Sequence, residues 1–206
     1  CGVDTTDSFK ATARPRLRRR PARAAYDRAT VYAILDDALI CHVSVEEIAT
    51  LFALDVTDGI DANDYSGPIV HRTEHRAGVI KIAGSADGPS DRDRRVFEAA
   101  AIAHRLTGVP ILTHCEAGTG ALEQLRLLTD HGVEPEHIAV SHIDKVVDRG
   151  YHRELLGSGA FGEYDQSFRW GDRPNGTLQL LAWAAEDGLE GQVLLGMDAA
   201  RRSYYR

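Results

Sequence analysis

Two short apolar runs decide the fold: VPILTH at residues 109–114 and HIAVSH at residues 137–142. Each has the composition of a buried strand and ends in a histidine. Two further runs of this kind are GVIKIA at 78–83, which contains a lysine, and QVLLGMD at 192–198, which ends in an aspartate. Each of the four predicted strands therefore carries a polar residue with metal-ligand or acid–base chemistry.

Amphipathic segments separate these strands, with apolar side chains at helical spacing over residues 91–106, 118–131 and 178–187. Strands and helices that alternate in this way form a parallel sheet. Repeated units that place functional residues at successive strand ends are typical of a (β/α)8 (TIM) barrel, whose site is built from those ends. A doubly wound sheet normally has a glycine-rich phosphate turn after its first strand, and this sequence has none. The α/β class and a TIM barrel are therefore predicted.

The spacing of the polar residues predicts a fifth strand. The interval from His142 to Asp198 is twice that from His114 to His142, so one more strand is expected near residues 159–164. Residues 78–198 would then form the core of the site.

The first 77 residues are less regular. A capping box at 44–47 begins an amphipathic helix that runs to about residue 59. Residues 31–35 and 1–6 are weaker strand candidates. The region 10–43 is atypical, because its many arginines follow no clear apolar period and favour exposed coil or a poor helix.

Composition limits the classes of function. The 206 residues, 43% hydrophobic and 27% charged, indicate one globular domain over 1–206. The sequence has neither an apolar run of roughly 18 residues nor a signal peptide, so a cytoplasmic protein without a membrane partner is expected. The net charge of -7 argues against nucleic acid, although seven arginines within 14–28 are open to that interpretation. Three scattered cysteines leave any metal to nitrogen and oxygen ligands.

Lys81 lies inside the apolar run VIKIA, where its side chain would face a packed interior. Burial lowers a lysine pKa from about 10.4 and favours the neutral amine. A neutral amine can add carbon dioxide and become a carbamate, whose two oxygens can bind two cations. The alternative is a lysine that extends along the strand to water.

His114 and His142 occupy matching positions after consecutive predicted strands, so one ion could reach both imidazoles. A histidine in such a place is otherwise a structural hydrogen-bonding residue. Asp198 follows a later strand and is a further ligand candidate, with a helix N-cap as the alternative.

The runs GVIKIA, THCEAGT (113–119), SHID (141–144) and LLGMDAARR (194–202) together resemble the fourth, fifth, sixth and eighth strand motifs of the phosphotriesterase family of the amidohydrolase superfamily. This resemblance implies a pair of divalent ions, zinc with manganese or cobalt as alternatives, bridged by carbamylated Lys81. It implies that His114 and His142 hold one ion, and that Asp198 binds the other and accepts a proton. A hydroxide bridging the ions would attack a small-molecule lactone, ester or phosphoester substrate.

The segment 163–173 follows the expected fifth strand and would form a loop over the site, where substrate choice is set. Arg169 and Arg173 are candidates for binding a phosphate or carboxylate, and Tyr164 for stacking on a ring. A solvated loop with packed aromatic side chains is the alternative. The loop and the last motif resemble lactonases, including sugar lactonases, more than organophosphate hydrolases.

The sequence departs from the family at its start. The family's first strand ends in a His-x-His pair, which this sequence lacks, and CGVDTT at 1–6 resembles the second strand. An incomplete barrel with approximately strands 2 to 8 is therefore expected, and a homodimer is one way to cover its open strand edges. Two hypotheses remain: a metal-dependent hydrolase, or a one-metal or metal-free fragment without turnover.

Overall fold

The computed structural model describes residues 43–63, 65, 69–85, 88–171 and 173–199. The strands predicted at 1–6 and 31–35 and most of the arginine-rich region lie outside these residues. Five strands form one parallel sheet in the order β1-β2-β3-β4-β5. They are β1 (Ile80–Gly84), β2 (Ile111–Cys115), β3 (Ile138–Ser141), β4 (Phe161–Tyr164) and β5 (Val193–Leu195). The four strands predicted from apolar runs are confirmed, and so is the additional strand near 159–164.

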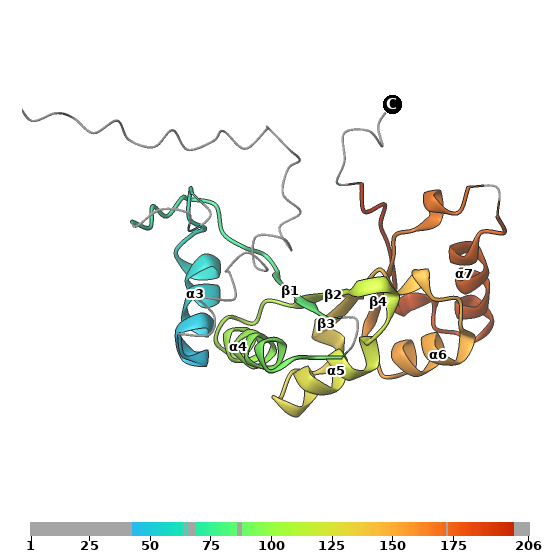
Figure 1. Cartoon of the computed structure of the whole chain (residues 1–206), viewed down its shortest axis with the longest axis horizontal. Helices are drawn as coiled ribbons and strands as arrows, with labels where there is room; N and C mark the ends of the chain where they lie inside the picture. Colours follow the sequence, from blue (N-terminus) through green and yellow to red (C-terminus); the bar gives the residue numbers. More distant parts are fainter. Residues whose placement is uncertain (1–42, 64, 66–68, 86–87, 172, 200–206) are drawn as a thin grey trace, which may run out of the picture.

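One helix precedes β1 and four others connect successive strands, and these four lie along one side of the sheet (Figure 1). They are α3 (Val45–Thr57), α4 (Asp91–Thr107), α5 (Ala121–Asp130), α6 (Arg149–Gly157) and α7 (Gly176–Glu186). Short 3-10 turns are η1 (Glu116–Gly118), η2 (Pro135–His137), η3 (Ile143–Lys145), η4 (Ser167–Arg169) and η5 (Glu190–Gln192). The sequence predicts all of these α-helices except α6.

Strand order and burial show that the sheet is wound in the manner of a barrel. Sequential parallel strands with crossovers on one side are the arrangement of a (β/α)8 barrel, whereas a doubly wound sheet reverses its strand order and is covered on both faces. The strand side chains that face the helices, such as Ile82 and Ile111, are fully buried. Those on the opposite face, such as Lys81 and His114, are only partly buried. This second face corresponds to the interior of a barrel.

The apolar core lies between the sheet and its helices. Its completely buried members include Phe97 of α4, Leu128 of α5 and Leu155 of α6, packed against Ile111 and Val140 of the strands. Helix α4 begins at a capping box in which the Ser90 hydroxyl accepts from the backbone N–H of Asp93 and the Asp93 carboxylate accepts from that of Ser90. The core thus fixes the helices on one side of the sheet and leaves the other side to the functional residues.

The segment that precedes β1 is held to helix α3 by a buried ion pair. Arg72 donates to the Asp55 carboxylate over 2.8 Å, and the hydroxyl of Tyr65 donates to the same carboxylate. Burial and the charge of Asp55 raise the pKa of Tyr65 to about 12. The capping box predicted at 44–47 is confirmed, with Ser44 and Glu47 exchanging side-chain to backbone bonds.

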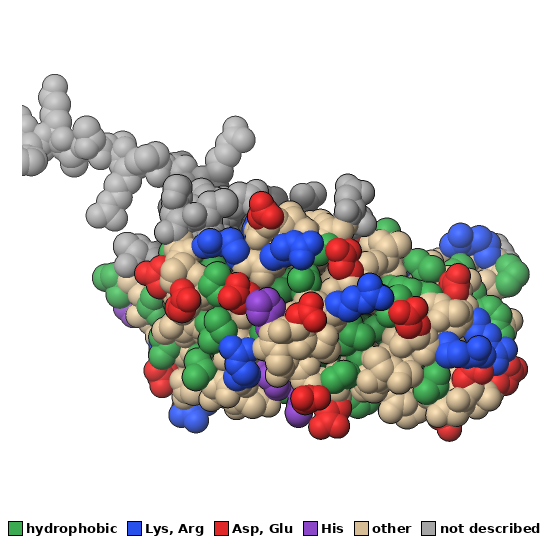
Figure 2. Space-filling model, turned by 90° about the horizontal axis from the view of Figure 1, so that it is seen from below, with side chains coloured by type: hydrophobic (Ala, Val, Ile, Leu, Met, Phe, Trp, Pro, Cys, Tyr) green, Lys and Arg blue, Asp and Glu red, His purple; other side chains and the backbone are tan. Residues whose placement is uncertain are grey.

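The helix-covered surface is polar and mixed in charge. Acidic and basic side chains alternate over it (Figure 2). Within the described part of the chain, no helix combines the length and the apolar character that a membrane span requires.

We predict that Leu128→Ala lowers the free energy of unfolding by about 2–5 kcal/mol, because it leaves a cavity in a layer that has no access to water. Urea denaturation followed by circular dichroism measures the change. Leu106→Ala is the control, since Leu106 is 69% exposed and its removal should cost less than about 0.5 kcal/mol. Equal effects of the two substitutions would contradict the assignment of the core.

Candidate functional site

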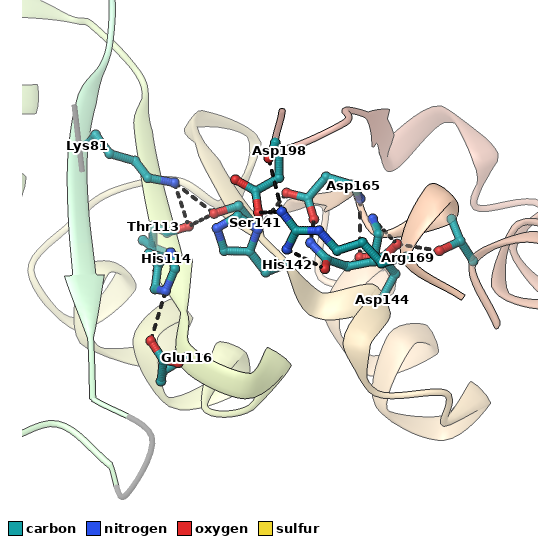
Figure 3. A network of polar contacts seen from close by, with 12 residues as sticks. Lys81, Thr113, His114, Glu116, Ser141, His142, Asp144, Asp165, Arg169 and Asp198 are labelled. Carbon is teal, nitrogen blue, oxygen red and sulfur yellow. Dashed lines mark hydrogen bonds and ion pairs between the residues drawn. The ribbon is translucent and has the colours of Figure 1, made fainter. Parts of the chain in front are cut away.

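Lys81 from the inner face of β1, His114 from β2 and His142 directly after β3 come together, because the Lys81 side chain reaches toward the carboxyl end of β3 (Figure 3). The parallel register pairs Ala83 with His114 and His114 with Ser141. These residues are far apart in sequence but lie side by side on neighbouring strands. The imidazole rings of His114 and His142 lie 4.4 Å apart in an edge-to-face arrangement. The structure therefore assembles the three residues that the sequence analysis assigned to one ion.

Lys81 points across the sheet toward β3 (Figure 3). Its Nζ lies 2.7 Å from Oγ of Ser141 and 3.4 Å from the carbonyl oxygen of Thr113. The side chain thus bends over the neighbouring strand instead of extending to water.

His114 has one engaged and one unengaged ring nitrogen. Its Nε2 lies 3.2 Å from Oε2 of Glu116, while its Nδ1 is buried without a hydrogen-bond partner. Burial lowers the pKa of His114, and the neighbouring His142 and Lys81 lower it further, against the opposing effect of Glu116. A neutral imidazole with a free, buried nitrogen is a suitable metal ligand.

His142 follows β3 directly in a left-handed backbone conformation, with φ of 68°. This conformation turns its ring toward His114. Nδ1 of His142 lies 2.6 Å from Oδ2 of Asp165, within ion-pair distance although the orientation departs from hydrogen-bond geometry. Burial alone would raise the pKa of Asp165, but contacts with His142 and Gln166 outweigh it and lower that pKa. Asp165 is thus an ionised partner that leaves Nε2 of His142 to face a ligand.

One ring nitrogen of each histidine could bind a divalent ion. Nδ1 of His114 and Nε2 of His142 are the ring atoms left over once Glu116 and Asp165 have taken the others. A metal-bound histidine usually has its second nitrogen engaged by a carboxylate in this way. Among the described residues, no group of three His, Cys, Asp or Glu side chains has metal-binding geometry, so the two histidines do not form a complete ligand set with other side chains of these types.

Asp198 follows β5, and its side chain lies near His142 and Arg169 (Figure 3). Its Oδ2 is 2.6 Å from Nη2 of Arg169, which also donates to the Asp198 carbonyl oxygen over 3.0 Å. The backbone of Asp198 is left-handed, with φ of 41°. In the part of the chain that the structure describes, Asp198 belongs to no group of three His, Cys, Asp or Glu side chains that could hold a metal ion.

A buried network beneath the site is centred on Asp144. Its carboxylate accepts from the backbone N–H groups of Asp165 and Gln166, over 3.2 and 2.9 Å, and from the hydroxyl of Thr177 over 2.5 Å. Trp170 donates to the same Thr177 hydroxyl over 3.1 Å. Asp144 therefore fixes the start of the loop that carries Asp165, the partner of His142.

The three residues predicted to bind substrate, Tyr164, Arg169 and Arg173, lie in different environments. Tyr164 is 1% exposed and its hydroxyl lies 2.8 Å from Nδ1 of His152, so it packs on the helix side of β4. This corrects the expectation that Tyr164 stacks on a substrate: strand alternation turns its side chain away from the barrel interior. Arg169 binds Asp198, and Arg173 is exposed, with its guanidinium 5.2 Å from the Trp170 ring.

Three functional candidates were missed in the sequence. Asp165 follows β4 directly and so carried the same strand-end signal as His142 and Asp198. Ser141 and Glu163 occupy paired positions on the inner face of the sheet. Burial and the nearby Asp165 raise the pKa of Glu163. Their alternation with the buried residues of β3 and β4 was the available signal.

Cys115, beside His114, is fully buried, and burial raises the pKa of its thiol to about 12, in keeping with a packing role.

Comparison with known proteins gives a consistent picture. Residues 31–206 match the model of the phosphotriesterase family. The chain is 34% identical to a phospho-furanose lactonase of Mycoplasmopsis synoviae, over 80% of this chain and 47% of that protein. It is 33% identical to an aryldialkylphosphatase of Saccharolobus solfataricus, over 75% of this chain and 47% of that one.

A solved structure has the same fold. The phosphotriesterase homology protein from Escherichia coli, complexed with phosphate in its active site, superimposes with a TM-score of 0.74 at 31% identity, covering 83% of this chain and 56% of that chain. This chain spans about half the length of the curated relatives that it matches.

We predict that Asp144→Asn speeds hydrogen exchange at the backbone amides of Asp165 and Gln166 and lowers the free energy of unfolding by about 1–3 kcal/mol, because an amide NH2 group would face buried donors. Exchange measured by mass spectrometry tests this. Asp148→Asn is the control, since Asp148 caps α6 at the surface and asparagine caps equally well. Unchanged exchange in the Asp144 variant would show that another contact holds the loop.

Proposed function

This chain belongs to the phosphotriesterase family, and from that premise we propose that it supplies one metal site of a hydrolase that opens small lactones or cleaves phosphoesters. One observation carries the proposal. The unpartnered Nδ1 of His114 lies on a ring 4.4 Å from that of His142, and Lys81 comes from the adjoining strand. A purely structural pair of buried histidines would be expected to engage both ring nitrogens of each residue.

In this proposal His114 through Nδ1, His142 through Nε2 and carbamylated Lys81 hold a divalent ion, zinc or alternatively manganese or cobalt. A bound ion of this kind lowers the pKa of water and polarises the substrate. Asp165 holds the ring of His142 in place, as the 2.6 Å contact indicates, and Glu116 does the same for His114.

Asp198 is proposed to accept the proton of the attacking water. Its carboxylate lies at the same end of the sheet as His142, and Arg169 fixes its orientation through two contacts. For the second ion implied by the family resemblance, the described residues offer only Asp198 and the bridging carbamate of Lys81 and no further group of three His, Cys, Asp or Glu side chains, so the role proposed for this chain is limited to the first ion and the proton acceptor.

We propose a lactone as the substrate, with a phosphorylated five-membered sugar lactone as the first to test. The lactonase resemblance of the loop 163–173 supports this choice, and so does the phospho-furanose lactonase among the relatives. Exposed Arg173, at the outer end of that loop, is the proposed phosphate contact, because a guanidinium can bind phosphate through two hydrogen bonds.

We predict that the chain supplied with zinc and bicarbonate binds metal, and that Lys81→Ala abolishes both this binding and any lactone hydrolysis. Metal content is measured by elemental analysis after gel filtration, and hydrolysis by a pH indicator. Lys145→Ala is the matched control, because Lys145 lies in η3 outside the strands and should retain the metal. Absence of metal in the unsubstituted chain would overturn the proposal, whereas bound metal without hydrolysis of lactones or phosphotriesters would favour the inactive one-metal hypothesis.

We predict further that Asp165→Asn weakens zinc binding about 10- to 100-fold, since it removes the charge that orients a ligand histidine. Isothermal titration calorimetry gives the affinity. Glu116→Gln should have a smaller effect, because Glu116 is exposed and its contact with His114 is longer, at 3.2 Å. If the two variants weaken binding equally, the buried pair has no special role.

A further inference from the structure

Ser141 lies between Lys81 and a backbone carbonyl. Its Oγ is 2.7 Å from Nζ of Lys81 and 2.7 Å from the carbonyl oxygen of Thr113 (Figure 3). Ser141 is 0% exposed, so no solvent water shares these contacts. The hydroxyl therefore joins β1 to β3 across the intervening strand β2.

The direction of these hydrogen bonds follows from their partners. A carbonyl oxygen can only accept, so the Ser141 hydroxyl donates its one proton to Thr113. The oxygen of Ser141 must then accept from Lys81. The Thr113 carbonyl, 3.4 Å from Nζ, is a second acceptor on the same side of the lysine. Both groups orient N–H bonds of Lys81 toward β2 and β3.

A hydroxyl differs from a carbonyl because it can reverse its role. Toward the free amine Ser141 accepts. Toward a carbamate, whose oxygens only accept, it can donate after rotation about its Cα–Cβ and C–O bonds. Thr113 then remains as the acceptor for the N–H that the carbamate retains. One buried side chain can thus serve the lysine in both of its chemical forms, which an alanine in this position cannot do.

We propose that Ser141 is a positioning residue for the carbamylation of Lys81, an inference that rests on the proposed function. In the reaction, the lone pair of the neutral amine attacks the carbon of carbon dioxide and forms an N–C bond. One C=O π pair moves to oxygen, and one N–H proton passes to water, so the product is a carbamate anion. Ser141 orients Nζ before this step and donates to a carbamate oxygen after it.

The residue's place in the sheet supports the proposal. Ser141 pairs in register with His114 and precedes His142, so it is a direct neighbour of both histidines as well as of the lysine. A serine whose only task was to satisfy its own hydroxyl would need the Thr113 carbonyl alone. The additional 2.7 Å contact with Lys81 is what a positioning role requires.

The test titrates the zinc-supplied chain with 13C-labelled bicarbonate and follows the carbamate carbon by NMR. Ser141→Ala should need on the order of tenfold more bicarbonate to reach half carbamylation, because a hydrogen bond to a charged group is lost. Ser158→Ala is the matched control, since the Ser158 hydroxyl donates to Leu155 and accepts from Ala160 in the turn between α6 and β4, and the variant should titrate like the parent chain. Circular dichroism melts establish that all three proteins are folded.

The outcomes separate the two proposals. A shifted titration for Ser141→Ala alone supports the positioning role. Identical titrations for Ser141→Ala and the parent chain overturn it and leave the proposed function intact. A parent chain that shows no carbamate signal at any bicarbonate concentration overturns the proposed function and, with it, this inference.

Discussion

The in-register parallel pairing of β1, β2 and β3 is the constraint on which the site depends. Because parallel strands present their carboxyl ends at one edge, residues from three separate βα units meet there without any local sequence contact. The register sets His114 beside Ser141 and Ala83, and it brings Nζ of Lys81 within 2.7 Å of Ser141. A slip of one residue in β2 would turn His114 toward the helices and bring Thr113 to the inner face. Core packing on the helix side therefore determines how the side chains of Lys81, His114 and Ser141 lie on the other side.

The same dependence links the buried core to the partner of His142. Asp144 lies beneath the site, where it holds the backbone of Asp165 and Gln166 and is itself held by Thr177 of α7. A buried carboxylate is costly unless its lone pairs are satisfied, and three donors satisfy this one. The position of Asp165 against His142 thus follows from helix packing. The loop after β4 is accordingly fixed at its start, where Asp144 binds the backbone of Asp165 and Gln166.

Much of this arrangement was predictable from the sequence, and the remainder has identifiable causes. The strands at 80–84, 111–115 and 138–141 follow from apolar runs, and the interval between His142 and Asp198 predicted β4. Tyr164 was misassigned because the exact end of β4 decides to which face its side chain points, and a strand boundary is uncertain by a few residues in sequence. Ser141 was overlooked because serine carries no ligand signal, and its role depends on a contact across two strands.

The loop after β4 joins the two halves of the site. Through Asp165 it contacts His142 of the proposed metal site, and through Arg169 it contacts Asp198, the proposed proton acceptor. Gln166 connects them, since its amide donates to Asp165 and its carbonyl oxygen accepts from Arg169 over 2.9 Å. A displacement of Arg169 would therefore also move Gln166 and, through it, Asp165. Because alternating donors and acceptors in a hydrogen-bonded chain fix one another's orientation, this loop couples the position of Asp198 to that of His142.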